Sequence, residues 1–340
     1  MPPTHIQSRE GRREHRKRRL RRHGRRAYIR SAYSLPSLAT LGNLICGFGA
    51  VYVASLSEKT GQLSPDPLTR WFYTNHFLVA AYLVFVAMLF DALDGRLARF
   101  TRHTTDFGGQ LDSLADVVSF GVAPAVLALQ VFHHEHLMDV APVISRLVWA
   151  IGALYASCAA IRLARFNVSN EHGEQHHFSF LGLPSPGAGG AVAALVLMQQ
   201  DMHEQTFTFG RGTTLGELFW NLSHVCVWLL PAVVLATGLL MVSGIRYPHV
   251  INRYLRGKRS LQRLLLMLVL ILAIFVAHRY VLGIGCLAYA LSGVLSWGYL
   301  RLRHKTGFGP KPPPASGGAA SARGNGPVHA PTLPDSRRAT

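Results

Sequence analysis

The sequence contains few cysteines and few acidic residues, and both shortages narrow what the protein can be. Its four cysteines lie inside apolar runs and show no C-x-x-C spacing, which argues against a zinc site or a disulfide framework. Charged residues make up only 15% of the chain, whereas hydrophobic residues make up 49%. The formal net charge is nevertheless +18, so the positive charge must be concentrated in a few places. This combination is typical of a membrane protein.

The N-terminus shows no ordinary signal peptide, because the first apolar run is long enough to span a bilayer and lacks a clear cleavage site. The run is preceded by an arginine-rich arm, residues 1–33. We expect this arm to be cytoplasmic, to fix the topology and to touch anionic membrane lipids. Binding of nucleic acid is the less favoured alternative, because the arm lacks interleaved aromatic residues and a recognised fold.

Long apolar runs predict an all-α polytopic membrane protein with eight spans. The predicted spans cover residues 34–56, 75–99, 109–132, 141–166, 183–200, 223–243, 261–277 and 280–300. We expect the first six, within residues 34–245, to form a transmembrane core, and residues 246–302 to add a basic loop and two further helices. A polar loop is expected at residues 201–218. The tail, residues 303–340, is rich in Pro, Gly and Ala and is predicted to be disordered.

Lysine and arginine residues gather in alternate loops of this scheme. With the arm inside the cell, the inside loops at residues 100–108, 167–182 and 246–260 carry or border most of the remaining basic residues. The positive-inside rule then predicts an even number of spans with both termini in the cytoplasm of a cell whose inner membrane holds the protein.

Four aspartates stand at fixed offsets where the second predicted span ends and the third begins: Asp91, Asp94, Asp112 and Asp116. Spacings of three and four residues place the members of each pair on one helix face. If a turn around Gly108 joins two helices, the two acidic faces can converge. Four carboxylates at the ends of membrane helices would repel one another unless a cation neutralises them. Mg²⁺ and Mn²⁺ prefer such oxygen ligands, so the pattern predicts a two-helix metal site.

The same stretch reads D-x-x-D-G-x-x-A-R, eight residues, then G-x-x-x-D-x-x-x-D, with every specified position filled. It resembles the signature of the CDP-alcohol phosphotransferases, integral membrane enzymes that make phospholipids from CDP-activated lipids. The resemblance implies two metal ions, with Asp91 and Asp112 bridging both, Asp94 binding one, and Asp116 binding the other and acting as general base. It also implies contacts with CDP-diacylglycerol by Gly95, Ala98, Arg99, Thr105, Gly108 and, from the first span, Asn43.

Other membrane proteins also carry aspartate pairs on their helices, notably cation-coupled transporters and transferases that use polyprenyl diphosphates. The Gly-x-x-Ala-Arg insert and the spacing to Asp116 favour the CDP-alcohol family over both. Outside this frame, Gly95 and Ala98 would be interpreted as helix-packing residues and Arg99 as a topology anchor.

Three further segments, LDSLADVVSFGVAPA, RLARFN and GLPSP, resemble bacterial members of the family that use serine as the alcohol. The implied reaction joins CDP-diacylglycerol and L-serine and releases CMP, and the implied assembly is a homodimer. Arg162 or Arg165 could hold the serine carboxylate, and Asn167 or Ser119 its other polar groups. Topology anchoring is the alternative for both arginines. Glycerol 3-phosphate or inositol phosphate stays open as the alcohol.

Overall fold

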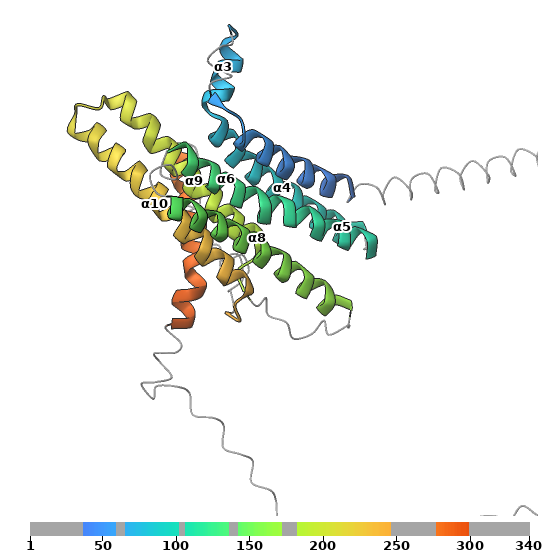
Figure 1. Cartoon of the computed structure of the whole chain (residues 1–340). Helices are drawn as coiled ribbons and strands as arrows, with labels where there is room; N and C mark the ends of the chain where they lie inside the picture. Colours follow the sequence, from blue (N-terminus) through green and yellow to red (C-terminus); the bar gives the residue numbers. More distant parts are fainter. Residues whose placement is uncertain are drawn as a thin grey trace, which may run out of the picture. The chain divides into compact units, whose positions relative to one another are not determined.

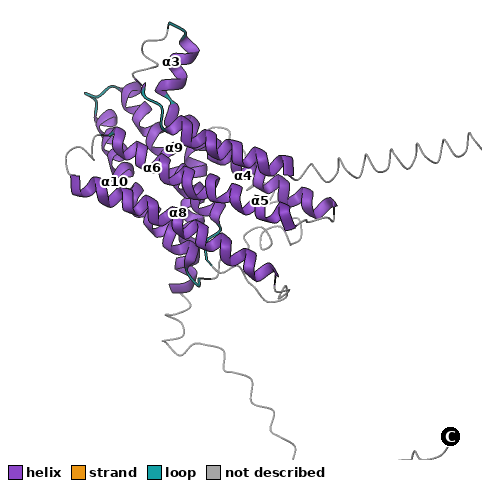
Figure 2. Cartoon of the chain, turned by 45° about the vertical axis from the view of Figure 1, so that its right-hand side comes forward, coloured by secondary structure: helices purple, strands orange, loops and turns teal. Residues whose placement is uncertain are grey.

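A computed structural model of the chain describes residues 37–58, 65–101, 106–135, 142–171, 182–245 and 277–298. Side chains are described for all of these except residues 98–101, 106 and 169–171. Within the described ranges every regular element is a helix and no strand occurs, as Figure 2 shows. The predicted all-α fold is therefore confirmed. The arm, the predicted span at residues 261–277 and the tail lie outside the described residues.

The described helices follow one another with short links (Figure 1). The first helix is Ser37–Ala54, and the last described helix is Ala277–Gly298. Between them lie α3 (Pro67–Thr74), α4 (His76–Thr101), α5 (Asp106–Asp116), the π-helical segment η1 (Val117–Val122), α6 (Ala123–His134), α8 (Pro142–Glu171), α9 (Ser185–Phe209) and α10 (Thr214–Val242).

Six helical stretches in the described part of the chain are long and apolar enough to cross a membrane. They are Ser37–Ala54, His76–Leu97, Phe107–His134, Pro142–Val168, Thr214–Val242 and Ala277–Gly298. The predicted multi-pass architecture is therefore confirmed. Helix α9, also a predicted span, is not among the six, because polar residues follow its apolar part. It is nevertheless buried along much of its length, so neighbouring helices rather than lipid surround it.

The predicted polar loop at residues 201–218 is wrong over most of its length. Helix α9 continues to Phe209 and α10 begins at Thr214, so only four residues join them. The side chain of Thr213 caps α10 by accepting a hydrogen bond from the N–H of Gly216, at 3.1 Å. Polar residues at the end of α9 were interpreted as a loop, although an ion pair with a distant part of the chain makes them compatible with a helix.

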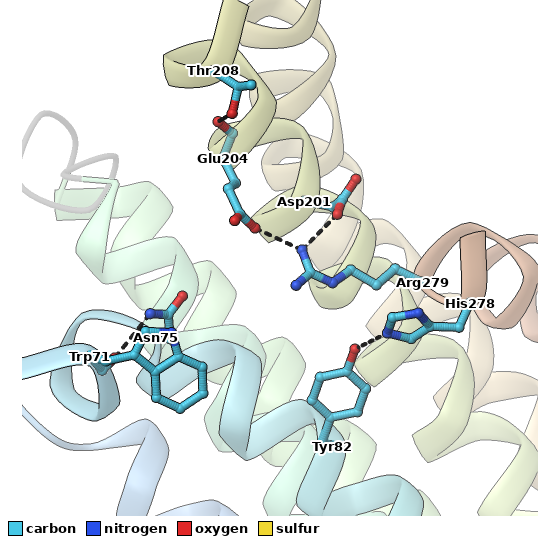
Figure 3. A network of polar contacts seen from close by, with 8 residues as sticks. All are labelled: Trp71, Asn75, Tyr82, Asp201, Glu204, Thr208, His278 and Arg279. Atoms are coloured by element: carbon cyan, nitrogen blue, oxygen red, sulfur yellow. Dashed lines mark hydrogen bonds and ion pairs between the residues drawn. The ribbon is translucent and has the colours of Figure 1, made fainter. Parts of the chain in front are cut away.

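That ion pair joins the last described helix to α9 (Figure 3). Arg279 donates through Nη1 to Asp201 Oδ1 at 2.6 Å and to Glu204 Oε2 at 2.8 Å. Beside it, His278 Nε2 and the hydroxyl of Tyr82 on α4 lie 2.6 Å apart. The last described helix is therefore held against both α4 and α9 at the end of the bundle where α4 begins.

Helix α9 packs against α4, α6, η1 and α10 and contributes a large share of the core. Its small residues permit this close packing. A Cβ added to Gly189, for example, would lie 3.3 Å from the Cα of Phe120 in η1. The glycine-rich start of α9 thus lets η1, which directly follows Asp116, sit deep in the bundle.

The segment before α9 is tied to the end of α10. The N–H of Gly182 donates to the carbonyl of Ile245 at 2.8 Å, and the N–H of Leu183 donates to the carbonyl of Leu240 at 3.0 Å. Gly182 has a φ of 84°, a left-handed conformation that glycine adopts without a steric penalty. A Cβ at this position would also overlap the carbonyl of Met241. These contacts fix the end of α10 close to α8 and the start of α9.

Candidate active site and metal centre

The structure brings the two halves of the acidic pattern together where α4 ends and α5 begins. Asp91 on α4 and Asp112 and Asp116 on α5 each offer one carboxylate oxygen, and the three oxygens lie within 4.8 Å of one another. Asp94 follows Asp91 by about one helical turn and lies beside Asp112. The convergence expected from the three- and four-residue spacings is therefore present.

Several oxygen atoms at this site are buried without a hydrogen-bond partner. Among the buried side-chain atoms that the structure describes, the ones without a partner are Asp94 Oδ2, Asp112 Oδ1 and Asn43 Oδ1. All three can only accept, and leaving such atoms unsatisfied is costly. The described ion pairs also involve other carboxylates, namely Glu58, Asp201 and Glu204.

An all-oxygen set with negative charge to be neutralised is the environment that hard divalent cations prefer. The residues present therefore fit Mg²⁺ or Mn²⁺. Asp91, Asp112 and Asp116 form a triad that could bind a metal, and Asp94 stands next to it. Which carboxylate bridges two ions, and whether two ions bind, stays a prediction.

The first helix contributes Asn43 to the site (Figure 1 shows this helix beside α4). Asn43 is fully buried, and its Nδ2 donates to Asp116 Oδ1 at 2.9 Å. Its backbone carbonyl accepts a hydrogen bond from Ser119 Oγ at 3.0 Å. A Cβ on Gly47 would overlap Ser119, so the close approach of the first helix to η1 requires a glycine there. Asn43 and Ser119 were expected to bind different substrates, and the structure instead joins them to each other.

The face of α4 next to Asp94 is partly enclosed and partly open. Thr40 of the first helix is buried and makes a hydrogen bond to Asp94. Gly95 is exposed, and a Cβ added to it would meet no atom within 4 Å. Tight helix packing therefore does not explain this glycine, and space for a ligand lies beside it. Gly108 is half-buried near the start of α5. The side chains of Ala98 and Arg99, and all of Thr105, lie outside the described residues.

A π-helical segment begins directly after Asp116, an element that sequence reasoning missed. Such segments are frequent at functional sites. Pro124 gives a signal that could have indicated it, because proline has no N–H to donate to the carbonyl of Phe120 four residues earlier. The hydroxyl of Tyr155 on α8 donates to that carbonyl at 2.9 Å. The backbone that follows Asp116 is thus held by α8 as well as by the first helix.

Of the residues predicted to bind the alcohol, Asn167 is the one that the structure brings into contact with α5. Its Oδ1 accepts from Ser113 Oγ at 3.0 Å, and its Nδ2 donates to Gln110 Oε1 at 3.3 Å. Sequence reasoning missed Ser113 and Gln110, although both stand within two residues of Asp112. Their hydrogen bonds bring the cytoplasmic end predicted for α8 next to the acidic helix.

The two predicted arginines have different surroundings. Arg162 is half-buried and donates through Nη1 to the backbone carbonyl of Met241 at 3.3 Å, near the end of α10. Arg165 is exposed. The hydrogen bond to a helix-end carbonyl gives Arg162 a structural role, which the prediction of carboxylate binding did not include.

Comparison with known proteins connects this geometry to a family. A model of the CDP-alcohol phosphatidyltransferase family matches residues 33–229, which include the four aspartates. The chain is 30% identical over 275 residues to the CDP-diacylglycerol–serine O-phosphatidyltransferase of Helicobacter pylori, a match that covers 81% of this chain and 95% of the relative. It is 28% identical over 270 residues to the enzyme of the same name from Methanocaldococcus jannaschii, covering 79% of this chain and 96% of the relative. It is 30% identical over 224 residues to the archaetidylserine synthase of Methanothermobacter thermautotrophicus, covering 65% and 72%.

Proposed function

Because the chain belongs to the CDP-alcohol phosphatidyltransferase family, we propose that it is a phosphatidylserine synthase, which transfers the phosphatidyl group of CDP-diacylglycerol to the hydroxyl of L-serine and releases CMP. The names of the relatives support serine as the alcohol and CDP-diacylglycerol as the donor lipid. The observation that carries the proposal is the convergence of three aspartates from two helices at the positions of the family signature.

In this proposal Asp91, Asp94, Asp112 and Asp116 hold two divalent ions, Mg²⁺ or Mn²⁺. When bound, such ions would neutralise the diphosphate of the donor lipid and stabilise the departing CMP. The partnerless oxygens of Asp94 and Asp112 support this role, since they accept no hydrogen bond from the described protein atoms.

Asp116 is the proposed general base. As the serine oxygen attacks the phosphorus that carries diacylglycerol, Asp116 takes the hydroxyl proton. A new phosphorus–oxygen bond forms to serine, and the bond from that phosphorus to the bridging oxygen breaks. CMP leaves with the electron pair, and no phosphorylated enzyme forms. A positioned base contributes roughly 10²- to 10⁴-fold to such a rate. The hydrogen bond from Asn43, which restrains the Asp116 carboxylate, supports the assignment.

The donor lipid is proposed to lie along α4 and the loop that follows it. The open space beside Gly95 supports an approach of the cytidine and phosphates to the helix backbone. Ala98, Thr105 and Gly108 would complete that surface, and Arg99 would bind a phosphate through its planar guanidinium. Serine would approach from the side of α8. There Asn167 is the best-supported contact, because it already bonds to α5, and Arg162 or Arg165 would bind its carboxylate.

The multi-pass helical core supports an integral membrane enzyme. We assign it to the cell (inner) membrane with both termini and the active site in the cytoplasm, on the distribution of lysine and arginine in the sequence. Residues 1–33 would contact anionic lipid, residues 34–245 would form the catalytic core, and residues 246–302 would add further spans. The functional unit is proposed to be a homodimer, as the family resemblance implies.

The experiment that tests this function is release of CMP from CDP-diacylglycerol by the purified full-length protein in detergent with Mn²⁺. Serine, glycerol 3-phosphate, inositol phosphate and no alcohol are compared in parallel, with Asp116→Asn as the inactive reference. Serine-dependent release that is lost in Asp116→Asn supports both reaction and site. Release with a different alcohol would reject serine while keeping the reaction class, and no release with any alcohol would reject the enzyme.

A further inference from the structure

Asn43 stands at the proposed general base with one half of its amide used and the other half unused. Its Nδ2 donates to Asp116 Oδ1 at 2.9 Å, while its Oδ1 is buried without a hydrogen-bond partner. The orientation of this amide follows from the chemistry of its neighbour. A carboxylate accepts hydrogen bonds, so the NH₂ group must face Asp116 and the carbonyl must face elsewhere.

The surroundings of Asn43 hold it in this position. The residue is fully buried, and Ser119 Oγ donates to its backbone carbonyl at 3.0 Å. Gly47, one turn further along the first helix, has no side chain and lets Ser119 approach closely. A side chain fixed from behind in this way can fix the carboxylate that it contacts, which is what a site needs to present a base in one orientation.

The unused carbonyl oxygen limits which ligand group can pair with it. The phosphates of CDP-diacylglycerol carry only acceptors, so they cannot satisfy a second acceptor. An N–H or O–H donor is required. Of the groups that the proposed reaction brings to Asp116, the ammonium of serine carries the most donors and a positive charge, and hydrogen bonds from charged donors are the stronger ones.

We propose that Asn43 is a positioning residue for the alcohol: its amide N–H orients Asp116, and its amide oxygen accepts a hydrogen bond from the ammonium group of serine. The inference rests on the proposed function and assigns Asn43 to the alcohol side of the site, rather than to the CDP-diacylglycerol contact that the family resemblance implies. It makes Asn43 a determinant of substrate choice, because an alcohol that lacks an amino group cannot make this bond.

The test compares steady-state kinetics of the full-length wild type and Asn43→Leu in detergent with saturating Mn²⁺. Leucine has nearly the shape of asparagine without its polar atoms. We expect kcat with serine to fall by about 100-fold, the lower end of what a positioned base contributes. KM for serine should rise severalfold, and KM for CDP-diacylglycerol should stay within twofold. The rate loss should be smaller with 3-hydroxypropionate, which is serine without its amino group, used as substrate or, if it does not react, compared as a competitive inhibitor.

Two further variants keep the test decisive. Ser119→Ala removes the support behind Asn43 but not its side chain, so it should give an intermediate loss of kcat, about threefold to tenfold, and it decides the matter if Asn43→Leu does not fold. Ser157→Ala removes a hydroxyl that bonds to the carbonyl of Ala153 on the exposed side of α8, at 2.8 Å, and serves as the neutral control. Equilibrium binding of Mn²⁺ should be the same in all four proteins.

The inference is overturned if Asn43→Leu keeps kcat/KM for serine within threefold of the wild type. It is also overturned if the variant raises KM for CDP-diacylglycerol while leaving KM for serine unchanged, because that would make Asn43 a nucleotide contact. Both results require an active wild type. An inactive wild type would reject the proposed function first, and with it this role for Asn43.

Discussion

The two ends of the helical bundle treat their buried carboxylates in opposite ways. Where α4 begins, Asp201 and Glu204 are neutralised by Arg279, with Asp201 only 11% exposed in its side chain. Where α4 ends, the structure describes no ion pair for the triad of Asp91, Asp112 and Asp116. The two regions are about 18 Å apart along α4, measured from Tyr82 to Asp94 at 1.5 Å per residue.

This difference separates structural from functional charge. Within a membrane, a buried carboxylate that is paired inside the chain holds helices together. A cluster that is left without a partner must be neutralised by something that binds. The first arrangement should tolerate replacement by apolar residues, and the second should not.

The largest effect is expected at the acidic end. Asp112→Asn should lower serine-dependent CMP release by about 1,000-fold or more, since the donor set for the metal and the placement of the diphosphate are both impaired. In the absence of metal, however, the same variant should unfold at an unchanged or higher temperature, because one of several mutually repelling charges is removed. A lower unfolding temperature in chelator would show that the triad is a structural element after all.

At the opposite end, Arg279→Met should lower the free energy of unfolding by about 3 kcal/mol, because it leaves Asp201 buried without a partner. The rate per folded molecule should change little. Denaturation in detergent measures the first quantity, and CMP release by the folded fraction measures the second.

The matched control for that prediction is the double variant Arg279→Met with Asp201→Leu. It should recover most of the lost stability, since two apolar residues can replace a buried ion pair. If it is as unstable as the single variant, the ion pair contributes in a way that burial of an unpaired charge does not explain.

Binding of Mn²⁺ should stabilise the acidic end by mass action. At a free concentration 100-fold above Kd, the wild type should gain about 2.7 kcal/mol. Asp112→Asn should gain much less, and Arg279→Met should gain the same as the wild type. The shift in unfolding temperature with added Mn²⁺ gives this comparison directly, and an equal shift in Asp112→Asn would place the metal elsewhere.

The smallest effect is expected from Tyr82→Phe, which removes the 2.6 Å contact with His278. The loss should be about 1 kcal/mol of stability, the usual size for one hydrogen bond, with no change in CMP release. Ser292→Ala, which removes a bond between a hydroxyl and a backbone carbonyl on the same last described helix, is the control for a purely local loss.

Sequence reasoning predicted one end of the bundle far better than the other. The acidic end was predictable because its residues repeat at helical spacing within one short stretch and fill a pattern that leaves few alternatives. The opposite end was not, because Asp201 and Arg279 are 78 residues apart and each alone is an ordinary polar residue at the edge of a span. The polar run after α9 was therefore interpreted as a loop.

Within the acidic end, the supporting residues were harder to predict than the carboxylates. Asn43 was selected, but its partner Asp116 lies 73 residues away, and no local pattern connects them. The link from Ser113 to Asn167 is of the same kind. Helix periodicity gives the face on which a residue lies, whereas the neighbour of that face depends on how helices pack, which one sequence does not encode in its spacing.

The measurement that tests the central claim most directly is the rate of serine-dependent CMP release as Mn²⁺ is added back to chelator-stripped wild-type protein. The account predicts no detectable rate without the metal and a saturable recovery. It also predicts the same midpoint for the variant Arg279→Met with Asp201→Leu, whose changed ion pair lies at the other end of the bundle. A rate that persists in chelator would contradict the claim that the acidic end requires a bound cation.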